Sequence, residues 1–295
     1  MSNVNFLLGV GAQKAGTTWV NQYLRRHPQT ACGRIKELHV FSNALRPDRF
    51  ADGRAKKIQR VRNYLDDQMQ ALGADGGVEN PEHLLAELDH LAMELDLARY
   101  WEYFRRLTAD RPDAVLTGEI TPAYSGLAAE QFEVIADGMR AHGFRPRVVF
   151  LMRDPVDRCY SMLKMGERNR AKEKGVAAPQ TAHENFAQAA VQPWNAIRTR
   201  YDETIRGLEE VFSADDIFYG FYETFFSESE VARLCEFLGI DFVKPNLHKK
   251  ANASPASAYP SPDDIAAVRE FYDATYRFCM DRFGETFIRS VWKHA

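Results

Sequence analysis

Short apolar runs alternate along this chain with longer stretches in which apolar residues recur at helical spacing. Compact apolar runs of this kind are typical of strands buried on both faces in parallel sheets. The stretch from Thr17 to Arg26 has helical periodicity and stops before Pro28, directly after the first run. We therefore predict an α/β fold with a central parallel sheet flanked by helices. The predicted strands are Phe6 to Val10, Val115 to Thr117, Val148 to Met152 and Ile217 to Phe221.

Two charged stretches and the C-terminal part depart from this alternation. Residues 43–110 are rich in charged helix formers, and we expect a helical insertion over one edge of the sheet. This insertion is either a solvated excursion or a determinant of specificity. The stretch from Lys164 to Lys174 indicates a surface segment, and Asp263 to Trp292 indicates amphipathic helices that pack on the sheet. We expect one domain over residues 1–295.

Composition and charge narrow the classes of function. The chain has 295 residues, 45% of them hydrophobic, with a formal net charge of -3, so no global field favours nucleic acid. Its 4 cysteines lie far apart with no CxxC pair, which argues against a zinc site and a disulfide framework. The apolar run from Phe6 to Val10 is too short for a signal peptide or a membrane span. These features favour a cytoplasmic enzyme; they do not indicate an oligomeric state.

The segment from Gly11 to Trp19 lies where a strand leads into a helix. Backbone N–H groups and the positive end of a helix converge there, which makes a ready site for an anion. Its two glycines are spaced as in a nucleotide-binding P-loop, but Thr17 stands where that loop has lysine, and Lys14 lies within the loop. The pattern predicts a P-loop-like three-layer sandwich without a standard NTPase loop.

A second candidate anion site follows the predicted strand Val148 to Met152. Arg153 stands at the carboxyl end of that strand, where open α/β sheets bind ligands. Asp154 suits a helix N-cap and Pro155 the first turn, which places Ser161 about two turns along the helix on a similar side. An arginine fork and a hydroxyl can together hold a phosphate monoester, although Arg153 alone would equally suit a structural ion pair.

These two motifs resemble those of sulfotransferases that use 3′-phosphoadenosine 5′-phosphosulfate (PAPS). The resemblance implies that Lys14 contacts the transferring sulfate, that Arg153 and Ser161 recognise the 3′-phosphate, and that a downstream basic loop closes on the nucleotide. It implies PAPS as co-substrate, 3′-phosphoadenosine 5′-phosphate (PAP) as product, and no metal. The implied nucleotide-binding residues are Lys14, Ala15, Gly16, Thr17, Thr18, Trp19, Arg153, Ser161, Lys249 and Lys250.

The segment from Lys36 to Phe41 supplies the candidate bases. It resembles the Lys-Glu-x-His-Phe-Phe stretch of the glycosaminoglycan and tyrosylprotein sulfotransferase branch, which implies Glu37 as general base and His39 as the supporting or alternative one. Ser42 departs from the aspartate that several heparan enzymes carry, which weakens any transfer of acceptor identity. The stretch Gly118 to Tyr124 also resembles a cleft-lining segment of this branch, or is a strand cap and turn.

Two other functions remain open at this stage. A P-loop kinase or NTPase would need a lysine after the second glycine and a magnesium-binding aspartate at a strand end. A non-catalytic nucleotide-binding module would have the phosphate sites without a base. We predict transfer of a sulfuryl group to a hydroxyl or amine of a carbohydrate or small molecule, with the acceptor itself unidentified.

Overall fold

The computed structural model describes residues 4–33, 35–46, 55, 58–67, 81–247 and 258–295. Five parallel strands form one sheet in the order β2-β3-β1-β4-β5. The strands are β1 (Val4–Gly11), β2 (Thr30–Cys32), β3 (Leu116–Ile120), β4 (Phe144–Met152) and β5 (Ile217–Phe221). The predicted parallel α/β fold is therefore confirmed.

The central strand β1 is buried because strands flank it on both edges and helices cover both faces. Leu8 pairs with Glu119 of β3 and with Val148 of β4, which fixes the register of the three strands. All four predicted strands are present, and β4 begins earlier than expected, at Phe144. The edge strand β2 was not predicted, because three residues are too few to show a periodicity.

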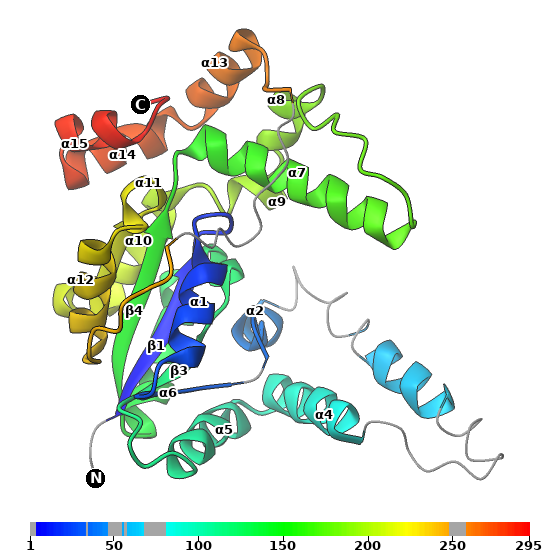
Figure 1. Cartoon of the computed structure of the whole chain (residues 1–295), viewed down its shortest axis with the longest axis vertical. Helices are drawn as coiled ribbons and strands as arrows, with labels where there is room; N and C mark the ends of the chain where they lie inside the picture. The colour runs from blue at the N-terminus through cyan, green and yellow to red at the C-terminus, as the bar shows by residue number, and fades with distance from the viewer. Residues whose placement is uncertain (1–3, 34, 47–54, 56–57, 68–80, 248–257) are drawn as a thin grey trace.

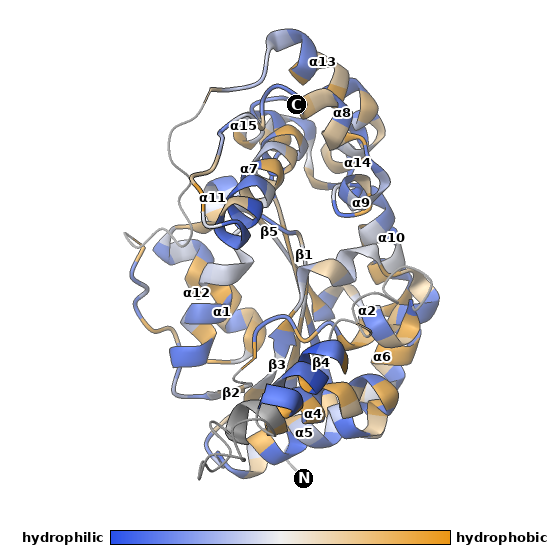
Figure 2. Ribbon diagram, turned by 90° about the vertical axis from the view of Figure 1, so that its right-hand side faces the viewer, coloured by the Kyte–Doolittle hydropathy of each residue, from blue (hydrophilic) through white to orange (hydrophobic). Residues whose placement is uncertain are grey.

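Helices lie on both faces of the sheet (Figure 2). One face carries α1 (Thr17–Arg26) and α12 (Glu228–Leu238), and the other carries α5 (Leu97–Ala109), α6 (Ala129–Ala141) and α10 (Tyr201–Val211). On the second face the ring of Phe6 in β1 lies 5.3 Å from that of Trp101 and 5.0 Å from that of Phe104, both in α5. Helix α1 begins and ends where the sequence predicts.

The carboxyl ends of the strands face a cap of further helices (Figure 1). The cap contains α7 (Pro155–Glu173), α8 (Phe186–Ala190), α9 (Pro193–Ala196), α11 (Tyr222–Phe225), α13 (Pro262–Phe271), α14 (Asp273–Phe283) and α15 (Glu285–Val291). Helix α13 packs on α7 and α8, and α14 packs on α10. The C-terminal part therefore packs mainly on other helices, with Trp292 contacting the sheet through Phe221 at 5.8 Å between rings.

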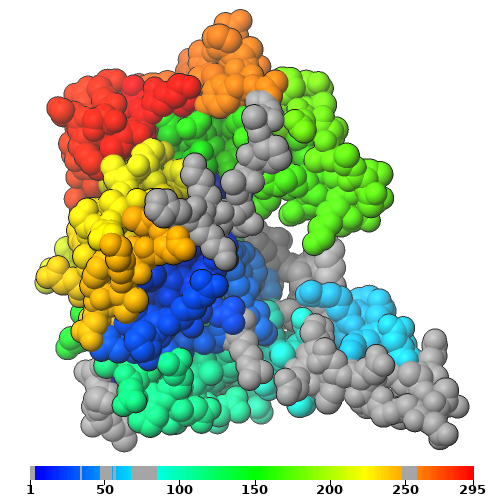
Figure 3. All heavy atoms as spheres, in the orientation of Figure 1, coloured from blue at the N-terminus to red at the C-terminus, as the bar shows by residue number. Residues whose placement is uncertain are grey.

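The described part of the 43–110 stretch is helical, as expected. It contains the end of α2 (Val40–Leu45), a helix at residues 58–67, α4 (Pro81–Leu95) and α5. Helix α4 packs on α2, and α5 packs on β2 and β3 at the edge of the sheet. In the space-filling view a notch separates the green atoms of α7 from the cyan helix 58–67 (Figure 3). The short 3-10 turns η1 (Pro122–Gly126) and η2 (Ala214–Asp216) complete the fold.

Candidate active site

A cavity of about 500 Å³ opens at the carboxyl end of β1. The loop between β1 and α1 forms its floor, and Gly16 caps α1 in a left-handed conformation with φ of 91°. The first backbone N–H groups of a helix have no partner within the helix, so those at the start of α1 are available to a ligand. The cavity is lined by Gln13, Lys14, Gly16, Thr17, Thr18, Trp19, Lys36, Glu37, Pro122, Arg153, Ser161, Met165, Asn169, Tyr222, Phe226 and Leu247.

Positive side chains gather around Lys14 in this cavity. The pKa of Lys14 is lowered to about 8, first by burial and then by the nearby charges of Arg168, Arg153, Lys36 and Lys164. Like charges this close raise one another's energy unless an anion neutralises them. The cluster of Lys14, Lys36, Arg153, Lys164 and Arg168, called here the cation cluster, is therefore suited to a multiply charged anion.

Arg153 is held by contacts that leave part of its guanidinium without a partner. Its Nη1 donates to the Lys14 carbonyl at 3.4 Å, and its Cζ lies 4.4 Å from the centre of the Tyr222 ring. Its buried Nε has no hydrogen-bond partner among the described residues. Asp154 caps α7 by accepting from the backbone N–H groups of Val156 and Asp157, so the predicted cap is confirmed. Ser161 lines the cavity from the same helix.

Glu37 lies at the edge of this cavity between two basic side chains. Lys36 contacts Glu37 Oε1 and also donates from Nζ to Thr18 Oγ1 at 3.0 Å, while His39 Nε2 lies 3.7 Å from Glu37 Oε2. Burial opposes ionisation of Glu37, but His39 and Lys36 outweigh that effect and hold its pKa at about 2. Glu37 is therefore a carboxylate at neutral pH and can accept a proton.

The backbone around Glu37 is strained and is held in place from β3. Glu37 and His39 both have left-handed backbones, with φ of 58° and 57°. Such conformations persist where the surroundings impose them, and they cluster at functional sites. Between them, the Leu38 N–H donates to Glu119 Oε2 at 3.0 Å, and His90 of α4 contacts the Leu38 carbonyl.

Glu119 is a buried carboxylate with a complete set of donors. It also accepts from Tyr100 at 2.9 Å, from Tyr124 at 2.7 Å and from Thr121 at 2.6 Å. The stretch Gly118 to Tyr124 was expected to be either a cleft-lining segment or a strand cap and turn. Its Glu119 holds the backbone of the Glu37 segment in position. Pro122 of the same stretch lines the cavity.

Most of the residues chosen from the sequence meet in the one cavity. Lys14, Gly16, Thr17, Thr18, Trp19, Arg153, Ser161 and Glu37 all line it. Ala15 is fully buried, and its N–H donates to the Ala12 carbonyl at 3.2 Å. His39 lies beside Glu37 and is not part of the lining. Lys249 and Lys250 lie outside the described residues.

The sequence reasoning missed several lining residues, mostly from α7 and the segment after β5. Residues 164–173 lie in α7, and most of them are exposed or half-buried, as expected of a surface segment. Met165 and Asn169 of this helix also line the cavity, which the sequence did not indicate. The charged residues of this stretch were expected to face solvent. The local sequence pattern does not show that the packing of α7 brings some of them close to the loop after β1. Lys36 was missed as a site residue, although it stands beside Glu37 in the quoted motif.

A parallel α/β fold with a cation-rich cavity at its strand ends defines a class of proteins that bind anionic ligands there. The chain matches the Sulfotransferase family over residues 7–244, so it belongs to this family of transferases. It is similar to the crystal structure of a sulfotransferase from Alicyclobacillus acidocaldarius, with TM-score 0.54, 16% identity and 94% of each chain covered. That likeness confirms the P-loop-like sulfotransferase fold.

Another solved structure is more distant. The sulfotransferase domain from the Synechococcus PCC 7002 olefin synthase has a TM-score of 0.45 at 17% identity, covering 92% of this chain and 96% of that one. No curated protein matches the chain significantly.

Two kinds of feature are absent from the described residues. These residues contain no helix of the length and apolar character needed to cross a membrane. They also contain no group of three or more histidine, cysteine, aspartate or glutamate side chains placed to hold a metal ion.

Proposed function

We propose that this chain transfers the sulfuryl group of PAPS to a hydroxyl or amine of a carbohydrate or small molecule. The observation that carries the proposal is the meeting of Lys14, Lys36, Arg153, Ser161 and Glu37 in one cavity. The cavity volume of about 500 Å³ is within the range of sites for ligands of this size. The buried Nε of Arg153 and Oε1 of Gln13, which lack partners among the described residues, are polar atoms that a bound nucleotide can satisfy.

Each cavity residue has a task in this proposal. The start of α1, with Thr17 and Thr18, binds the 5′-phosphate, and Lys14 neutralises the sulfate and the oxygen that bridges it to phosphorus. Arg153 and Ser161 bind the 3′-phosphate, which distinguishes PAPS from ATP. Trp19 and Tyr222 supply ring surface to the same cavity.

Glu37 is the proposed general base. The acceptor oxygen or nitrogen forms a bond to sulfur while the bond from sulfur to the bridging oxygen breaks, and the acceptor proton passes to the Glu37 carboxylate. A carboxylate with a pKa of about 2 is a weak base while Lys36 contacts it. A bound sulfate within reach of Lys36 would draw that charge away from Glu37 and so raise its basicity.

The test compares nucleotides that differ in the 3′-phosphate. PAP at 100 times its Kd should stabilise the fold by about 2.7 kcal/mol, and ADP by much less, measured as a shift in Tm. Arg153→Ala should remove the difference between PAP and ADP. Arg145→Ala, an exposed arginine on β4, is the matched control and should keep the difference. Equal shifts with PAP and ADP in the wild type would refute the assignment of Arg153 and Ser161.

The alternatives are separated by two further measurements, the Tm shift with ATP and magnesium and the turnover of PAPS. A kinase or NTPase would be stabilised by ATP with magnesium, and a non-catalytic module would bind PAP without turning over PAPS. Nothing in the cavity favours either over sulfuryl transfer. The single domain over residues 1–295, the cytoplasmic location and the choice between hydroxyl and amine stay predictions.

A further inference from the structure

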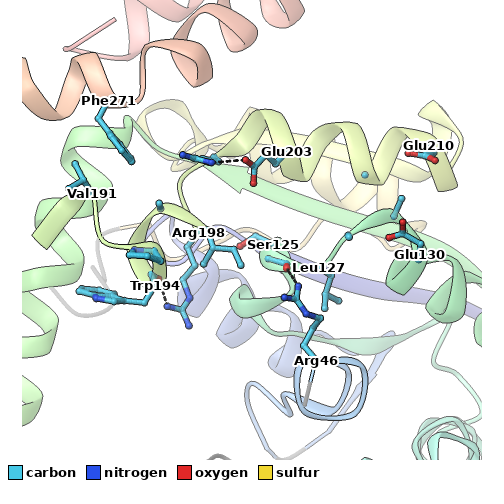
Figure 4. A pocket seen from close by; sticks show the side chains of 18 residues that line it. Arg46, Ser125, Leu127, Glu130, Val191, Trp194, Arg198, Glu203, Glu210 and Phe271 are labelled. Carbon is cyan, nitrogen blue, oxygen red and sulfur yellow. Dashed lines mark hydrogen bonds and ion pairs between the residues drawn. The ribbon is translucent and has the colours of Figure 1, made fainter. Parts of the chain in front are cut away.

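A second and larger cavity, of about 1060 Å³, shares the η1 turn with the first and is shown in Figure 4. Pro122, at the start of η1, lines the first cavity, and Ser125 and Gly126, at its end, line the second. Helix α2 also links the two cavities. Glu37, which lines the first cavity, precedes α2, and Arg46, which lines the second, follows α2. A six-residue helix is about 9 Å long, so the second cavity begins a short distance from the base.

Arg198 is a cation of this cavity that has no acidic partner among the described residues. Its Nη1 donates to the Trp194 carbonyl at 2.8 Å, and no carboxylate of the described residues lies within ion-pair distance of it. Arg200, which lines the same cavity, differs because it pairs with Glu203 at 3.0 Å. Burial and then the charge of Arg158 lower the pKa of Arg198, whereas the charge of Glu37 opposes them, so Arg198 lies within electrostatic reach of the base.

A second positive charge contacts α9, the short helix that carries Trp194. Arg158 is fully buried, and its Nε and Nη1 have no hydrogen-bond partner among the described residues. Its Nη2 contacts the Asn195 side chain and donates to the Asn195 carbonyl at 3.4 Å. A buried guanidinium without a carboxylate is costly, and its field favours a negative charge nearby.

The cavity is polarised along its length. Figure 4 shows Arg198 and Trp194 at one end, and Glu130 and Glu210 at the other. Trp194 is 45% exposed, so much of its ring surface is open to a ligand. An acidic group is therefore attracted to the end that holds Arg198 and repelled from the opposite end.

We propose that this second cavity binds the sulfuryl acceptor, and that Arg198 binds a carboxylate on that acceptor. The acceptor class is then a hydroxylated or aminated carboxylic acid, with its apolar part against Trp194 and its nucleophile towards Glu37. This inference rests on the proposed sulfuryl transfer and adds the chemical class of the acceptor. Arg198 is a specificity-determining residue in this scheme and takes no part in binding the nucleotide.

The experiment uses pairs of acceptors that differ only in their negative charge. We would measure binding to the enzyme–PAP complex by calorimetry, and turnover with PAPS, for 4-hydroxyphenylacetate against 4-hydroxyphenylacetamide and for glucuronate against glucose. In at least one pair the acid should bind more tightly and turn over with a higher kcat/KM, by about 10- to 100-fold, as loss of one charged hydrogen bond implies. Arg198→Gln should abolish the preference and Arg198→Lys should restore part of it.

Matched controls separate this inference from the proposed function. Arg206→Gln removes an arginine of α10 that pairs with Asp202 and does not line the cavity, so it should keep the preference for acids. PAP affinity and the slow hydrolysis of PAPS without acceptor should be unchanged in Arg198→Gln. If no acid binds the wild-type complex better than its neutral partner, or if Arg198→Gln keeps the preference, the inference is wrong even where PAP binds selectively. Loss of selective PAP binding in the wild type would instead overturn the proposed function.

Discussion

Lys14 makes the proposed donor site sensitive to pH. Its pKa in the free protein is about 8, because it is buried among other cations. A bound anion would raise this pKa towards the ordinary lysine value, so binding takes up a proton at pH values between the two. The charged form of Lys14 favours binding of the anion, so deprotonation of Lys14 above pH 8 lowers the affinity for the anion.

We therefore predict that PAP affinity varies little on account of Lys14 below pH 8 and falls by up to about tenfold per pH unit above it. Calorimetry in two buffers of different ionisation enthalpy measures both the affinity and the proton uptake. In Lys14→Met the affinity should be lower and its decline above pH 8 should disappear. A decline of equal slope in Lys14→Met would assign the titration to another group.

Glu37 and His39 can be separated by their effects on rate. Glu37→Gln keeps the shape of the side chain but removes its basicity, and loss of a general base typically lowers the rate by ~100–10,000-fold. PAP affinity should remain nearly intact, because the phosphate-binding residues lie on other segments. Single-turnover rates with PAPS, together with PAP binding, give the two quantities.

His39→Ala is the control for this assignment. His39 contacts Glu37 without lining the cavity, so its loss should lower the rate less than loss of Glu37 does. Near-normal turnover in Glu37→Gln, combined with an inactive His39→Ala that still binds PAP, would make His39 the base.

At the scale of elements, β3 and the segment before α2 depend on each other through Glu119. Glu119→Gln places an amide where the carboxylate accepts four hydrogen bonds, so at least one donor faces the NH2 group. Each buried donor left without an acceptor costs about 1–3 kcal/mol, which urea denaturation would detect. The rate should fall as well, since the Leu38 N–H that holds the Glu37 segment loses its acceptor, while PAP binding changes little.

Glu133→Gln, at an exposed site on α6, is the matched control for this change. It should leave both the free energy of unfolding and the rate near those of the wild type. Unchanged stability in Glu119→Gln would show that Glu119 does not fix this segment.

The elements of this fold differ in how far the sequence predicts them. The strands β1, β4 and β5 are buried on both faces, so they appear in the sequence as runs of apolar residues and could be predicted. The loop after β1 could also be predicted as an anion site, because its residues form a local motif. The contact of Leu38 with Glu119 joins residues 81 positions apart, and the place of Met165 in the cavity depends on the direction of α7. Such contacts are set by packing between elements, so no local pattern reports them. The residues that line the second cavity come from four separate stretches of chain and were missed for the same reason.

At the scale of the molecule, positive charge is concentrated near one loop and is not spread over the whole surface. The net charge is -3, yet five cationic side chains meet at the loop after β1. Many arginines elsewhere pair with nearby acids, as Arg282 does with Glu209 at 2.9 Å and Arg289 with Glu285 at 2.8 Å. The densest group of cations is therefore at the first cavity, which fits a nucleotide better than a long polyanion.

This distribution of charge predicts that sulfuryl transfer does not need a divalent metal. Kinases use magnesium to neutralise the phosphates of their donor, whereas here Lys14, Lys36 and Arg153 supply fixed positive charge at the corresponding place. The rate with PAPS and a competent acceptor should be the same in excess EDTA as in millimolar magnesium. Lys14→Ala should be impaired in both donor binding and rate, and magnesium should not restore it. A strict requirement for magnesium, or turnover of ATP in place of PAPS, would instead favour the kinase function.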